Sequence, residues 1–264
     1  MIVDSHLHLG TTMAAPRLDK SMEATLSLMD HMGVDMAIQA SSALMHGQLE
    51  RGYQKCLKDY QESGGRFLSY AYFDPHDPEA HLQSVRACLD EEPFVGIKIH
   101  PAKARCFPDD KLWDVIWRCA SQRNVPILTH SWWTSSYNPT QQYATPDRFE
   151  RYVSEYPDVQ LILGHAGGRY EGHRAAVALM NAHPNVWVDL SGDLYAFGQV
   201  EWFVAQVGAE RILFGTDITF LDGRTVLGHI LDADISRQEK GLILGENAAH
   251  LFRLDSHEKG QLGT

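Results

Sequence analysis

The sequence predicts a single parallel (β/α)8 barrel, and three observations carry this prediction. Eight short apolar runs, rich in β-branched and aromatic residues, alternate with eight longer runs that have helical spacing. Glycine, proline and other turn-forming residues separate the runs. The length of 264 residues is about that of one such barrel. We therefore expect one domain over residues 1–264, with a polar tail from about residue 256.

The first four strands are predicted at residues 2–8, 35–40, 67–73 and 95–100. Asp74-Pro75 closes the third strand and Pro101 the fourth, because proline cannot donate to a β-ladder. Gly33 and Gly64-Gly65 are helix stops. The helices of this half are predicted at about residues 18–32, 50–63, 78–90 and 110–123.

The second four strands are predicted at residues 126–130, 159–165, 186–189 and 211–217. Thr145-Pro146 supplies a cap and a first-turn residue for a helix that runs to Tyr156. Further helices are predicted at about residues 170–182, 200–207, 237–244 and 246–252. Glu246 and Asn247 are expected to anchor the last helix. The competing fold is an open doubly wound sheet, but no Gly-x-Gly-x-x-Gly turn follows any strand.

Composition excludes several classes of partner. The formal net charge of −11 argues against binding to nucleic acid, which needs clustered Lys and Arg. No apolar stretch has the length of a membrane span, and no secretory signal is recognisable. The four cysteines lack metal-knuckle or redox spacing. We expect a cytoplasmic protein with reduced thiols and a small-molecule substrate, and a homodimer is an open alternative to a monomer.

Histidine, lysine and aspartate gather at the ends of the predicted strands. The ends of strands one, four, five, six and eight carry His6 and His8, Lys98 and His100, His130, His165, and Asp217. The carboxyl ends of barrel strands meet in one mouth, where active sites lie. Zinc and similar ions bind imidazole nitrogen and carboxylate oxygen, so three histidines and one aspartate form a complete set. Position alone does not rank His100, His130 and His165 as ligands.

The motifs resemble the amidohydrolase superfamily, in its branch of single-domain barrels known as amidohydrolase 2. The resemblance covers nearly the whole chain. It is carried by Asp4-Ser5-His6-Leu7-His8, Gly96-Ile97-Lys98-Ile99-His100-Pro101, Leu128-Thr129-His130, Leu163-Gly164-His165-Ala166-Gly167-Gly168, Leu213-Phe214-Gly215-Thr216-Asp217 and Leu244-Gly245-Glu246-Asn247-Ala248-Ala249.

The resemblance implies that His6, His8, His130 and Asp217 hold one divalent metal ion, zinc before manganese. His165 would stand beside the reacting oxygen. Asp4 is expected to support a ligand without binding the ion. A modified Lys98 bridging two ions is a less favoured alternative.

Four residues are predicted to bind substrate. Lys98 is a barrel cation that could meet an anionic substrate, and His100 follows it on the same strand. Trp132, or its neighbour Trp133, would wall the pocket. Arg169, at the start of a predicted helix, could bind a substrate carboxylate. An exposed position on the surface with no role in binding is an equal alternative.

The predicted activity is metal-assisted hydrolysis of an amide, ester or lactone, with Asp217 moving the proton and His165 stabilising the oxyanion. The alternative is nonoxidative decarboxylation of an aromatic or unsaturated acid. Lys98, Arg169 and the tryptophans would suit such a substrate. The third possibility is a barrel that serves as a binding or structural module, without a metal ion. Specificity is expected to lie in the loops at residues 10–20, 131–144 and 218–225.

Overall fold

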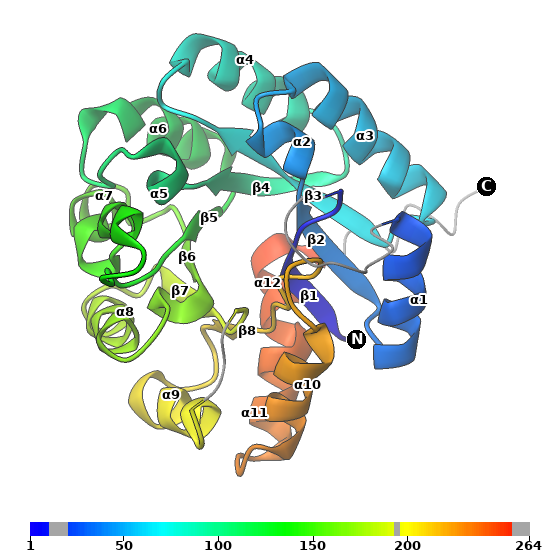
Figure 1. The fold of residues 1–264 in the computed structure, drawn as a ribbon, viewed down its shortest axis with the longest axis vertical. Helices are drawn as coiled ribbons and strands as arrows, with labels where there is room; N and C mark the ends of the chain where they lie inside the picture. The colour runs from blue at the N-terminus through cyan, green and yellow to red at the C-terminus, as the bar shows by residue number, and fades with distance from the viewer. Residues whose placement is uncertain (11–20, 193–195, 255–264) are drawn as a thin grey trace.

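The computed structural model, which describes residues 1–10, 21–192 and 196–254, is a (β/α)8 barrel and confirms the predicted fold. One sheet carries the strands in the order of the chain, and every pair of neighbours is parallel. The helices surround the strands in sequence order, as the colours of Figure 1 show. The strands are β1 (Val3–Leu7), β2 (Met36–Ala40), β3 (Phe67–Phe73), β4 (Phe94–Ile99), β5 (Ile127–His130), β6 (Leu161–Gly164), β7 (Val186–Asp189) and β8 (Ile212–Leu213).

The longer predicted helices are present with ends shifted by a few residues. They are α1 (Met22–Met32), α3 (Leu49–Glu62), α4 (Pro78–Leu89), α6 (Asp114–Arg123), α7 (Glu150–Glu155), α8 (Glu171–Ala182), α9 (Gln199–Val207), α11 (Arg237–Gly241) and α12 (Asn247–Phe252). A π-helical turn, η5 (Leu242–Glu246), joins the last two into one rod. Short 3-10 turns are η1 (Lys111–Trp113), η2 (Pro139–Tyr143), η3 (Pro146–Phe149) and η4 (His165–Gly167).

Three helices were not predicted. Two are single turns after strands, α2 (Ser42–Met45) and α5 (Pro101–Ala104). The third, α10 (Gly223–Asp232), contains two glycines that disguise its helical spacing, and the Asp222 side chain caps it by accepting a hydrogen bond from Arg224 N. Its first residues overlap the loop predicted at 218–225. Most of the loop predicted at 10–20, and the predicted polar tail, lie outside the described residues.

The eighth strand was predicted too long. β8 ends at Leu213, and the next residues turn toward β1 to close the barrel. Ser5 N donates to Phe214 O, and the amides of Thr216 and Asp217 both donate to His6 O at 3.2 and 2.8 Å. Two successive amides on one carbonyl are incompatible with a regular ladder, in which successive groups alternate in direction. This closure brings the segment that ends in Asp217 against the His-x-His strand.

Two apolar cores hold the barrel together. One lies between strands and outer helices and includes Trp113, Trp117 and Phe149. The other fills the interior of the barrel and extends to α12. Ala248 and Phe252 of this helix close the end of the barrel opposite the mouth. The polar side chains at the other end therefore rest on a packed apolar floor.

Asn247 anchors this closing helix, as its sequence position led us to expect. Its buried side-chain amide donates to Ala209 O at 2.7 Å and to Ile212 O at 2.8 Å. Asn247→Ala would leave two buried carbonyls without these donors, so we expect a loss of about 2–3 kcal/mol in the free energy of unfolding. Thermal unfolding followed by circular dichroism measures the effect. Asn181→Ala on the exposed surface of α8 is the control; equal melting temperatures for both variants would contradict the anchoring role.

The four cysteines are free and buried, which predicts slow thiol chemistry. Burial raises the pKa of Cys56 and of Cys106 to about 11 and that of Cys88 to about 12. The thiolate, which is the reactive form, is therefore scarce at pH 8. We expect Ellman's reagent to react slowly with the native protein and to release the full thiol count only in guanidinium. Rapid release of that count without denaturant would refute the prediction.

Over the described residues, no helix combines the length and the apolar character needed to cross a bilayer.

Candidate metal centre

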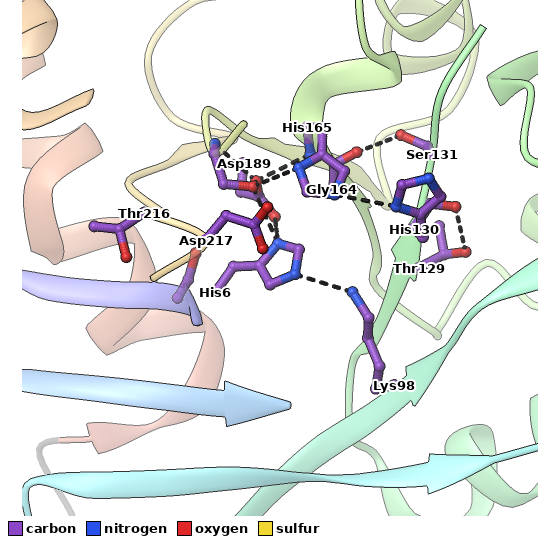
Figure 2. A network of polar contacts seen from close by, with 12 residues as sticks. His6, Lys98, Thr129, His130, Ser131, Gly164, His165, Asp189, Thr216 and Asp217 are labelled. Atoms are coloured by element: carbon purple, nitrogen blue, oxygen red, sulfur yellow. Dashed lines mark hydrogen bonds and ion pairs between the residues drawn. The ribbon is translucent and has the colours of Figure 1, made fainter. Parts of the chain in front are cut away.

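The side chains predicted to form the site converge at the carboxyl ends of the strands. Figure 2 shows His6, Lys98, His165 and Asp217 directed toward one another from different sides of the barrel. His6 and Lys98 are essentially inaccessible to solvent, and His8 and His165 are buried as well. Buried polar groups in such number need mutual hydrogen bonds or a bound ion to offset their desolvation.

His8 and Asp217 face each other in a way that calls for a cation. His8 Nδ1 lies 2.9 Å from Ala40 O, and because a carbonyl only accepts, Nδ1 carries the proton. In the neutral ring Nε2 then holds a lone pair, and it lies 3.3 Å from Asp217 Oδ1. Two electron-rich atoms at this distance repel unless a proton or a metal ion lies between them.

His6 is oriented by hydrogen bonds to both of its ring nitrogens. Nδ1 donates to Asp189 Oδ2 at 2.9 Å, and Nε2 accepts from Lys98 Nζ at 3.1 Å. Burial, followed in importance by the nearby Lys98, lowers the pKa of His6 well below its usual value, so the ring is neutral. A carboxylate behind Nδ1 is the arrangement that commonly orients a histidine whose Nε2 binds a metal.

His6, His8 and Asp217 offer ligand atoms that all lie within 4.8 Å of one another. Two imidazoles and one carboxylate are a donor set that suits zinc, manganese and similar ions. The residues present therefore fit one divalent ion.

A second group, His6, His165 and Asp189, is equally compact, but hydrogen bonds account for it. Asp189 accepts from the His6 ring, from His165 N at 3.0 Å and from Ser191 Oγ at 2.5 Å. Ser191 Oγ in turn lies 2.9 Å from His165 Nδ1. This carboxylate thus holds the two histidines in place, and these hydrogen bonds account for the compact group without an ion.

His130 contacts His165 and is not part of the group formed by His6, His8 and Asp217. Its Nδ1 is 3.1 Å from His165 Nε2, and its Nε2 is 2.9 Å from Gln141 Oε1. Burial lowers its pKa to about 4, so the ring is neutral and able to bind metal. Its ring nitrogens are not part of the three-residue groups found among the described residues. Its role as a fourth ligand stays a prediction.

A cavity of about 440 Å³ opens in front of these residues. Its polar wall carries predicted site residues: His8, Lys98, His100, His130, His165 and Asp217. The other lining side chains are mostly apolar or aromatic, namely Met45, Trp132, Tyr137, Phe220 and Leu221, with the polar Asn138 and Gln141 among them. The volume is within the usual range of small-molecule sites. A larger cavity of about 600 Å³, lined in part by Pro126, Gln160 and Trp187, lies at the opposite end of the barrel, away from these groups.

Lys98 and Arg169, the two predicted substrate cations, have different positions. Lys98 is buried in the barrel and lines the cavity. Burial lowers its pKa to about 8 against the opposing effect of Asp189 and Asp217, so it remains largely a cation at neutral pH. Arg169 is not among the residues that line the cavity; its guanidinium carbon lies 5.9 Å from the centre of the Trp132 ring.

Two residues at the mouth have left-handed backbones. The φ angle of His165 is 62° and that of Asp217 is 58°, a conformation that costs a non-glycine residue of the order of 1 kcal/mol. Asp4 stabilises the strand closure beside Asp217: its carboxylate accepts from His6 N, Thr216 N and Thr216 Oγ1. Both strained positions carry predicted catalytic side chains, as is common at functional sites.

Asp189, Ser191 and Gln141 contact the site histidines but were not predicted as site residues. Asp189 ends the predicted seventh strand just as Asp217 ends the eighth, so the strand-end rule contained the signal. Ser191 and Gln141 lie in loops, where sequence spacing gives no such signal.

The fold and this strand-end constellation define an enzyme of the amidohydrolase superfamily. A model of the amidohydrolase family matches residues 3–254, and the chain belongs to this family.

Known proteins similar to this chain include decarboxylases and a hydratase. A gamma-resorcylate decarboxylase of Rhodococcus jostii is 23% identical, with 72% of this chain and 71% of that protein covered. A dihydroxybenzoic acid decarboxylase of Polaromonas sp. JS666, solved with manganese and the inhibitor 2-nitroresorcinol, is 18% identical, with a TM-score of 0.72 over 96% of this chain and 97% of that one. A 4-oxalomesaconate hydratase of Rhodopseudomonas palustris, also 18% identical, has a TM-score of 0.76 over 100% of both chains.

Proposed function

We propose that this protein is a metal-dependent nonoxidative decarboxylase of a small aromatic carboxylic acid. The observation that carries the proposal is the juxtaposition of the His6, His8 and Asp217 donor set with a small-molecule cavity whose remaining lining is mostly apolar and aromatic. The names of the similar proteins favour this activity over the hydrolysis that the sequence first led us to expect.

The reaction exchanges a carboxyl group for a proton. The carbon–carbon bond breaks, its electron pair stays on the ring carbon, carbon dioxide leaves, and that carbon receives a proton. When bound, a divalent ion would supply a Lewis acid that holds the anionic substrate and withdraws electron density from it. Manganese is a candidate beside zinc, because the Polaromonas relative was solved with manganese.

Asp217 is the carboxyl group on the cavity wall and is our candidate for the group that takes a proton from water and passes it to the ring carbon. Lys98, a buried cation on the same wall, would attract the substrate carboxylate. His165, held by Asp189 and Ser191, would contact a substrate oxygen. The apolar wall would exclude water and position the ring.

The test is an assay of the purified protein loaded with manganese or zinc. Loss of 2,6-dihydroxybenzoate with formation of resorcinol, followed by liquid chromatography, is the expected result. A parallel assay records proton release from a panel of lactones. Metal-dependent proton release without decarboxylation of any hydroxybenzoate would reject the proposal and restore hydrolysis.

A further inference from the structure

His100 stands on the cavity wall with the position of its proton fixed by the backbone. It is the N-cap residue of α5, and its Nδ1 accepts a hydrogen bond from Lys103 N at 3.1 Å. A backbone N–H group always donates, so Nδ1 holds a lone pair. The ring is therefore neutral, and its one N–H proton is on Nε2.

The orientation of the His100 ring is fixed as well. The ring stacks on His130, with the centroids 4.2 Å apart and the planes 13° from parallel. His130 in turn lies parallel to Trp132, at 6.3 Å and 4°. The hydrogen bond and the stack together restrict both side-chain torsions of His100. A donor held in this way loses little conformational entropy when a ligand binds.

The Nε2–H group of His100 has no hydrogen-bond partner among the described residues, although the ring lines the cavity. Other site histidines have their ring nitrogens directed at protein groups: His6 at Asp189 and Lys98, His130 at His165 and Gln141. His100 thus presents to the cavity a neutral, oriented donor that the protein itself does not satisfy.

We propose that His100 determines specificity by donating Nε2–H to a hydroxyl oxygen on the substrate ring. This inference rests on the proposed function. The metal donor set and Lys98 are suited to the carboxylate, which carries the negative charge. A neutral donor beside these groups suits an uncharged ring oxygen better than a carboxylate, so the preferred substrates are hydroxybenzoates and not plain benzoate. Sites that hydrogen-bond a substrate hydroxyl discriminate strongly against analogues that lack it.

The experiment compares His100→Phe, which keeps an aromatic ring in the stack and removes the donor, with His100→Gln, which restores an amide donor near the position of Nε2. For the metal-loaded enzymes, kcat/KM is measured with 2,6-dihydroxybenzoate and the dissociation constant is measured with benzoate. His100→Phe should lower kcat/KM by about 10- to 100-fold, leave benzoate binding within about twofold, and be partly rescued in His100→Gln.

Equal losses for hydroxylated and plain benzoates, or no loss for either, would overturn the assignment. Nitrogen NMR of the wild type covers the case of a variant that fails to fold: adding resorcinol should shift the His100 Nε2–H signal, and adding benzoate should not. If the wild type decarboxylates no hydroxybenzoate, the proposed function fails. If it does, but His100→Phe retains the full preference for hydroxylated rings, this inference alone fails.

Discussion

Asp217→Asn should lower kcat/KM by about 1,000-fold or more and should weaken metal binding. Asp217 Oδ1 lies 3.3 Å from His8 Nε2, so an ion bound by both residues would lose its anionic ligand. The substitution also removes the proposed proton donor, and general acid catalysis alone typically contributes about 100- to 10,000-fold. Both losses arise from this one side chain. The hydrogen bond from Asp217 N to His6 O at the strand closure holds its backbone in place.

The measurement for Asp217→Asn combines steady-state decarboxylation with metal content by mass spectrometry. Asp222→Asn is the matched control: it lies five positions further along, is exposed, and caps α10, where asparagine serves as well. The control should keep its activity within about twofold. Near-normal turnover in Asp217→Asn would remove this residue from the catalytic centre.

Asp189→Asn should lower turnover by about 100-fold, although Asp189 is not a proposed ligand. Its two oxygens accept from the His6 ring on one side and from His165 N, Ser191 N and Ser191 Oγ on the other. An amide has one accepting end. In either orientation its NH2 group meets a donor, so His6 is forced into the wrong tautomer or His165 loses its support.

Kinetics and thermal unfolding should be recorded together for Asp189→Asn, since a buried mismatch also reduces stability. Ser191→Ala is the graded comparison. It removes one donor to Asp189 and the Oγ contacts to His6 Nδ1 and His165 Nδ1, but it leaves the hydrogen bond between Asp189 and His6, so a smaller loss of about tenfold is expected. An Asp189→Asn enzyme with wild-type turnover would show that the His6 tautomer is not set by this carboxylate.

The fold was predictable because the barrel repeats one local signal. Apolar runs such as Phe67–Phe73 stop at breakers, and the helices between them have a clear apolar face. The prediction failed where tertiary contacts override local pattern. Residues 214–217 look like a continuation of β8 but bond to β1, and Gly223 and Gly228 hide α10.

The candidate site was predictable to the extent that it lies at strand ends. His6, His8, Lys98, His130 and His165 meet at one mouth because parallel strands place their carboxyl ends together. Proton positions were not predictable, because they depend on partners such as Ala40 O and Lys103 N that only the folded chain brings close. Substrate preference was not predictable either, since loop side chains such as Trp132 and Phe220 form part of the cavity lining.

Metal content measured by inductively coupled plasma mass spectrometry tests the one-ion centre most directly. We expect about one equivalent of a divalent ion in the wild type after reconstitution with manganese or zinc, and almost none in a His6→Ala, His8→Ala double variant that retains its fold. Two equivalents in the wild type would support a bridged pair involving Lys98. Equal metal content in the wild type and the double variant would contradict the proposed ligands.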